Sequence, residues 1–159
     1  MRRNFLAIFT LGLLVVACGS TQKHVSTKSV ERSPAPMMKL LPVSFSDEVA
    51  SGKFKAECSM LQVLNDSIIE NSANVTLSSD ASGYALEVSF VEVVPHRWVF
   101  GSVRPSSSAT FIASVTKDGQ TIDTTKKTIG SAVAFGACDR LEKIALASGR
   151  YVAKWIVRK

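Results

Sequence analysis

Apolar residues recur along this chain with two different periods, and each period predicts a different kind of element. Between residues 51 and 71 they are spaced three or four residues apart, the spacing that lines one side of a helix. From 84 to 94 they alternate with polar residues, as expected of a strand with one buried face, although the alternation slips after Phe90, which suggests a bulge or burial on both sides. Further strands are predicted at 109–116 and 121–129, joined by Lys117-Asp118-Gly119-Gln120. Asp-Gly is a leading signal for a tight hairpin.

A second amphipathic helix is predicted from about 137 to 157. Its basic residues are expected to face solvent, and they are Arg140, Lys143, Arg150 and Lys154. Asp139 with Glu142 approximates a capping box at its start. Short strands are expected at 42–45 and 74–78. This order predicts an α+β domain: an antiparallel four-stranded sheet (a meander) with two helices packed on one face.

The first residues predict export. Arg2 and Arg3 precede an apolar run that ends at Ala17, a small residue, and this is the pattern of a secretory signal peptide. The run is shorter than the roughly 20 residues that a spanning helix needs. The predicted organisation is a signal peptide at 1–17, a lipidated N-terminus and flexible tether at 18–42, and a periplasmic α+β domain at 43–159. The tether is rich in Ser, Thr, Lys and Pro, a composition that cannot bury enough apolar surface to become ordered.

The sequence Val15-Val16-Ala17-Cys18 resembles the lipobox of bacterial lipoproteins, although that family more often has Leu where Val15 stands. The resemblance implies that the Cys18 thiol carries acyl chains such as palmitate and becomes the mature N-terminus. Gly19 is not Asp, and the resemblance therefore implies an outer-membrane location facing the periplasm. The alternative is an ordinary secreted protein cut near Ala17, with Cys18 as a spare thiol.

Two cysteines remain in the body of the chain, Cys58 and Cys138. In an exported protein such a pair predicts a disulfide. Closing a loop of about 80 residues would stabilise the fold by about 4 kcal/mol in the chain-entropy estimate. The histidines, His24 and His96, do not have the spacing of a zinc site, so no metal and no cofactor is expected.

The net charge of +6 becomes +4 without Arg2 and Arg3 of the predicted signal peptide, which is modest, and the basic residues are scattered along the sequence. Nucleic-acid binding needs a concentrated basic face, so no nucleic-acid partner is expected. The expected membrane contact is the lipid anchor at Cys18.

One connection, residues 96–108, is longer than a hairpin needs and carries a candidate partner-binding loop formed by His96, Arg97, Trp98 and Arg104. Arg and Trp are enriched at binding hot spots, so the expected partner is an envelope protein or a glycan with acidic groups. The alternative is that Trp98 and Phe100 extend a strand and fold onto the core. A catalytic role for His96 is not favoured, because no Gly-x-Ser-x-Gly elbow accompanies it and a lone loop histidine is usually a surface residue.

The order of the predicted elements resembles that of small, uncharacterised periplasmic lipoproteins, some of which are subunits of export assemblies. The resemblance implies a membrane-anchored, non-catalytic binding or envelope-assembly accessory protein. An inhibitor of a hydrolase such as lysozyme is the alternative, with 96–104 as the inhibitory loop. A small periplasmic enzyme centred on His96 is the third reading.

Overall fold

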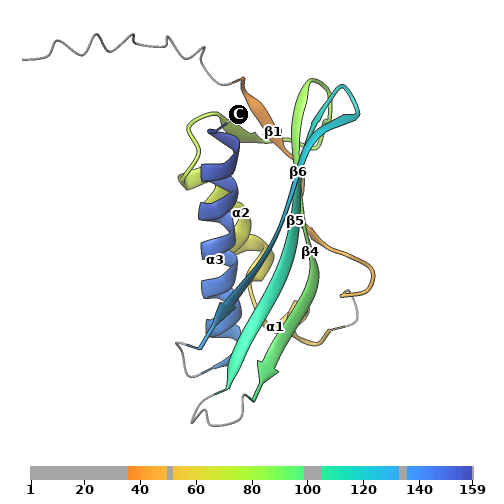
Figure 1. The fold of residues 1–159 in the computed structure, drawn as a ribbon. Helices are drawn as coiled ribbons and strands as arrows, with labels where there is room; N and C mark the ends of the chain where they lie inside the picture. Colours follow the sequence, from red (N-terminus) through yellow and green to blue (C-terminus); the bar gives the residue numbers. More distant parts are fainter. Residues whose placement is uncertain (1–35, 50–51, 99–104, 133–135, 159) are drawn as a thin grey trace, which may run out of the picture. The chain divides into compact units, whose positions relative to one another are not determined.

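Three long antiparallel strands form the largest part of the sheet in the computed structural model (Figure 1). The structure describes residues 36–49, 52–98, 105–132 and 136–158. The long strands are β4 (Tyr84–Arg97), β5 (Ser106–Lys117) and β6 (Gln120–Ser131). Asp118 and Gly119, between β5 and β6, both have positive φ values of 48° and 82°. This confirms the predicted tight hairpin, and the predicted bulge is present between Phe90 and Glu92.

The sheet is mixed, so the predicted four-stranded antiparallel meander is wrong outside β4, β5 and β6. Three short strands are added, and the order is β3-β1-β4-β5-β6 with β2 also on β4. These strands are β1 (Met38–Leu40), β2 (Ser44–Phe45) and β3 (Val75–Leu77). All of their pairings are parallel. Parallel neighbours need a crossover connection, and the helical segment between β2 and β3 supplies it.

Strand β1 lies inside the range that the sequence analysis assigned to the tether. Met38 and Leu40 are buried in the core while Lys39 between them is half-buried. This alternation of buried and half-buried residues is that of a strand, but three residues are too few for a two-residue period to be recognised in the sequence. The signal peptide and residues 18–35 of the proposed tether, Cys18 among them, lie outside the described residues.

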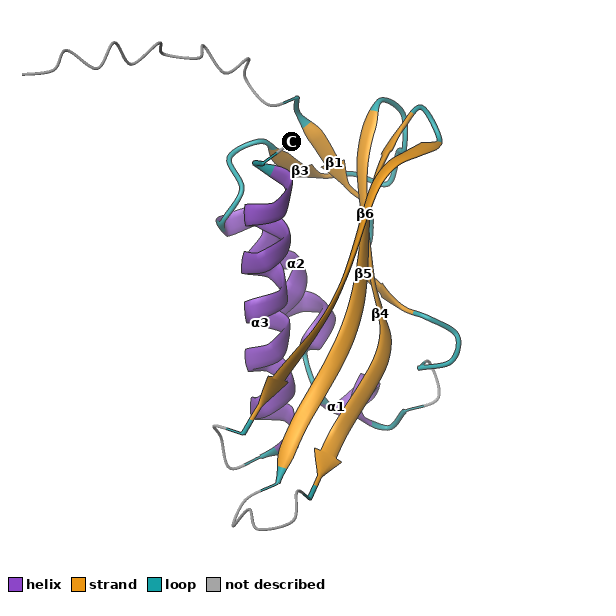
Figure 2. Cartoon of the chain, viewed as in Figure 1, coloured by secondary structure: helices purple, strands orange, loops and turns teal. Residues whose placement is uncertain are grey.

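Two long helices, α2 (Met60–Glu70) and α3 (Ala137–Ile156), lie on one side of the sheet (Figure 2). The predicted first helix is interrupted: a short helix α1 (Phe54–Glu57) ends at Cys58, whose backbone is extended. The main chain of Ser59 then starts α2, and its N–H donates to Glu142 of α3. Glu142 therefore caps α2, and the predicted capping box of Asp139 and Glu142 is wrong. Instead, Asp139 accepts a hydrogen bond from the N–H of Gly136.

Within the described residues no helix is long and apolar enough to cross a membrane.

Cys58 and Cys138 form a disulfide, as the sequence predicted, with their Cα atoms 5.0 Å apart. The bridge joins the start of α2 to the first turn of α3 across 80 residues of sequence. A constraint of this loop length stabilises a fold mainly by restricting the unfolded chain.

The two ends of the sheet carry different parts of the chain. Figure 1 shows β1, the β5–β6 hairpin and the C-terminal end of α3 at one end, and the end of β4, the start of β5 and the start of α3 at the other. A 12-residue strand such as β5 spans about 40 Å at the usual rise per residue. Pro36 and Trp98 therefore lie at opposite ends of the sheet.

Helices α2 and α3 approach closely at Gly149. A methyl group built on Gly149 would lie 2.5 Å from Cβ of Ser67 and 3.0 Å from the carbonyl oxygen of Leu64. The Ser67 hydroxyl in turn donates to the carbonyl of Leu146 at 2.9 Å. The glycine is thus required by packing, because its φ is not in the left-handed region.

We predict that Gly149→Ala lowers the free energy of unfolding by about 1–3 kcal/mol through overpacking, although alanine is the better helix former. The measurement is urea unfolding followed by circular dichroism. Gly130→Ala is the matched control, since a methyl group there would meet only the Ser107 carbonyl oxygen, at 3.5 Å. A Gly149→Ala protein as stable as the control would contradict the close helix contact.

Candidate functional site

The candidate site lies where β4 ends and β5 begins. The register between these strands shifts between Val94 and Arg97. Pro95 sits within this shift, at a place where it need not donate a backbone hydrogen bond. Its carbonyl accepts a 2.6 Å hydrogen bond from the Ser107 hydroxyl. The irregular strand end is therefore tied to the neighbouring strand through side chains.

Arg140 from the first turn of α3 is buried beneath this strand end. Only 1% of its surface is exposed, so the predicted outward orientation is wrong. Its Nε donates to Ser107 Oγ at 2.9 Å, and its Nη2 approaches the Pro95 carbonyl at 3.5 Å and His96 Nδ1 at 3.4 Å. A buried guanidinium is tolerated when its donors are satisfied, and these contacts join α3 to both strands.

His96 is placed by Arg140 on one side and by Trp98 on the other. Arginine can only donate hydrogen bonds, so in this contact His96 Nδ1 is the acceptor. The His96 and Trp98 rings meet edge to face with centroids 5.5 Å apart. The His96 imidazole therefore contacts both the Arg140 guanidinium and the Trp98 indole.

Trp98 is 66% exposed, the largest exposed fraction among the large apolar side chains of the described residues. The alternative reading that Trp98 folds onto the core is therefore wrong, while Phe100 lies outside the described residues. Arg97 is also exposed, and its carbonyl accepts from the Ser106 hydroxyl at 3.4 Å. Arg104, the fourth predicted member of the loop, lies outside the described residues.

This arrangement provides an exposed aromatic surface and a cation on a supported strand end. A large aromatic ring contributes contact area at small entropic cost, which suits binding. Within residues 36–49, 52–98, 105–132 and 136–158, no group of three or more His, Cys, Asp or Glu residues is placed to hold a metal.

Sequence reasoning missed Arg140, although a signal for it was present. Arg140, Ile144 and Ser148 are spaced four residues apart and all three are buried. The helical period alone would have placed Arg140 on the inner stripe, but its charge led to the opposite assignment. A charged residue in register with an apolar stripe is therefore a candidate for a buried, hydrogen-bonded role.

Comparison with known proteins gives the fold and little else. No protein-family model and no curated protein matches the chain. A DUF330 protein from Xanthomonas campestris is 13% identical, with 77% of this chain and 87% of that chain covered and a TM-score of 0.52. A hypothetical protein from Chlamydia trachomatis is 11% identical, with 78% and 99% covered and a TM-score of 0.50.

A structure named as a lipoprotein, from Caulobacter crescentus, is 10% identical, with 74% and 88% covered and a TM-score of 0.48. That TM-score is too low to carry an argument. The first two structures show that this chain has a known small α+β fold. A fold does not fix a function, which has to be argued from the site.

We predict that Arg140→Ala lowers the free energy of unfolding by about 2–4 kcal/mol, because it leaves a cavity and removes hydrogen bonds from buried polar groups. Arg140→Lys should recover only part of this loss, since an ammonium lacks the planar set of donors. Chemical unfolding measures both.

The matched control is Arg150→Ala, which removes an exposed arginine from the same helix and should change stability by less than about 0.5 kcal/mol. Equal effects at positions 140 and 150 would show that Arg140 has no special structural role.

Proposed function

We propose that this chain is a lipid-anchored, non-catalytic binding protein of the bacterial envelope, held at the outer membrane and facing the periplasm. The anchor is proposed from the lipobox-like sequence ending at Cys18. The binding role is supported by one observation above the others. Trp98 is largely exposed, yet its ring packs against His96, which the buried Arg140 contacts.

The support beneath Trp98 favours a binding role over a chance exposure. The His96 ring contacts the indole, and Arg140 fixes His96 from inside the domain. An anchor residue that is already positioned loses less freedom on binding, so more of its contact energy appears as affinity. Large exposed aromatic residues on rigid supports are typical of interface hot spots.

The proposed partner is an envelope protein with acidic groups around an apolar hollow. The hollow would accept the Trp98 indole, and the acidic groups would face the exposed Arg97. Charges at the rim of such a contact mainly raise the association rate and are screened by salt. The complex should therefore form more slowly at high ionic strength.

We predict that Trp98→Ala weakens this complex by about 2 kcal/mol or more, which is roughly a thirtyfold loss of affinity. Native gel electrophoresis of mildly solubilised envelopes measures the fraction of the protein in a larger complex. Leu77→Ala is the matched control, because Leu77 is another exposed apolar residue (57% exposed) in a different strand. Loss of the complex in both variants, or in neither, would count against the site.

We predict that Cys18→Ser abolishes incorporation of labelled palmitate and moves the protein from the membrane fraction to the soluble fraction. One acyl chain binds a bilayer only marginally, so firm retention requires the several chains that lipoproteins carry. Ser20→Ala is the control for a neutral change two residues from the modified cysteine. An unmodified Cys18 thiol in the native protein, detected by mass spectrometry, would exclude the anchor.

A further inference from the structure

Apolar side chains that are exposed or, at Tyr84, half-buried gather where the described chain enters the domain. Pro36, Met37, Tyr84 and Ile122 form what we call the tether-end patch. A hollow of about 410 Å³ is lined by Pro36, Tyr84 and Ile122 together with Met38, Val115 and Asp123. A neighbouring hollow of about 540 Å³ shares Pro36, Met38 and Tyr84 and adds Met37. Met37 is 61% exposed and Ile122 is 55% exposed.

The position of the patch indicates what covers it. Pro36 is itself part of the patch, and only residues 19–35 separate it from the proposed anchor at Cys18. A coil of this length has a mean span on the order of 20–25 Å. The proposed anchor would therefore keep the patch at a high effective concentration of lipid, where even a weak contact with lipid would be populated.

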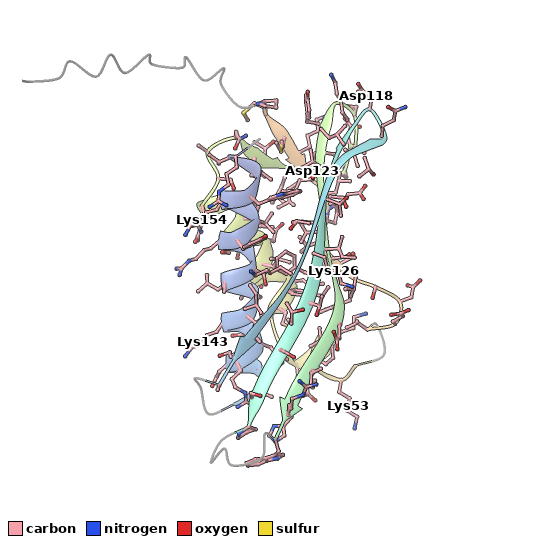
Figure 3. The ribbon with its side chains drawn as sticks, in the orientation of Figure 1. Lys53, Asp118, Asp123, Lys126, Lys143 and Lys154 are labelled. Atoms are coloured by element: carbon pink, nitrogen blue, oxygen red, sulfur yellow. A yellow bond between two sulfur atoms is a disulfide. The ribbon has the colours of Figure 1, made fainter. Side chains whose placement is uncertain are left out.

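The charges around the patch suit a lipid surface. Lys117 is exposed and its Nζ lies 5.3 Å from the centre of the Tyr84 ring. Figure 3 shows Lys154, also exposed, on α3 toward the same end of the domain. Tyrosine and lysine are typical of membrane interfaces, where an apolar body meets polar headgroups.

The carboxylates at this end are engaged within the protein. Asp80 is 2.6 Å from Lys39 Nζ, and hydrogen bonds from Lys39 and then Ser82 hold the pKa of its carboxyl well below the usual range. Asp118 accepts a hydrogen bond from the Gly83 N–H, and Asp123 accepts one from the Thr124 N–H. Each bond engages one carboxylate oxygen, and the pairing of Asp80 with Lys39 compensates its negative charge within the protein.

We infer that the tether-end patch rests on the bilayer surface, with Met37 and Ile122 among the lipid headgroups and Lys117 and Lys154 facing anionic lipids. The inference rests on the proposed lipid anchor at Cys18. It implies a defined orientation: the sheet stands away from the membrane, and its length carries Trp98 about 40 Å outward.

The test uses the full-length lipidated protein in vesicles of phosphatidylethanolamine and phosphatidylglycerol. An environment-sensitive fluorophore is attached to Ile122→Cys, and in a second protein to Trp98→Cys at the opposite end of the sheet. Lipids with nitroxide-labelled headgroups should lower the emission at position 122 severalfold and leave the emission at 98 unchanged. Adding Met37→Asp to the Ile122→Cys protein should restore most of the lost emission, because it places a charge in the apolar contact.

Two results would overturn the inference. The first is an unquenched probe at position 122 on a chain whose mass shows acylated Cys18, which would leave the anchor intact. The second is a blue-shifted probe at 122 before vesicles are added, with sedimentation of a larger species, which would show that a second copy of the chain covers the patch. An unmodified Cys18 would instead remove both the anchor and the orientation.

Discussion

The buried guanidinium of Arg140 joins three segments that are distant in the sequence. It connects the first turn of α3 with the end of β4 through Pro95 and His96, and with the start of β5 through Ser107. The disulfide at Cys138, two residues earlier, fastens the same turn of α3 to the start of α2. A covalent bond and a set of charge-assisted hydrogen bonds thus meet at one end of the domain, where Trp98 is exposed.

This concentration of constraints explains how an irregular strand end can present a side chain. The register shift near Pro95 removes regular ladder bonds, and a strand end without them would be a poor platform for binding. Arg140 and Ser107 replace the missing ladder bonds from within the core. The opposite end of the domain is built differently, with short parallel strands and an apolar patch at the entry of the chain. The two ends therefore differ in a way that suits the two contacts we propose, one with a partner and one with a membrane.

Elements with strong local signals could be predicted from the sequence. The β5–β6 hairpin followed from Asp118-Gly119, because its turn needs positive φ at both positions. The disulfide followed from the number of cysteines and from the prediction that the protein is exported.

The features that depend on tertiary context were missed. Strand β1 is too short to show a period. The apolar spacing from Phe54 to Ile68 continues through the break at Cys58, so periodicity could not reveal two helices. The burial of Arg140 depends on acceptors supplied by β4 and β5, which no local pattern of α3 contains. The sequence also could not decide whether Trp98 is exposed or buried, because the alternation of β4 is interrupted after Phe90.

The most direct measurement of the central claim is photo-crosslinking in living cells from a photoreactive amino acid placed at position 98, compared with the same residue at Thr124 on β6. Both positions are exposed, so they differ in surroundings and not in access. The account predicts discrete adducts with an envelope protein from position 98 and none from position 124. Adducts from Thr124 with none from position 98 would contradict it, and would move the binding surface to the edge strand.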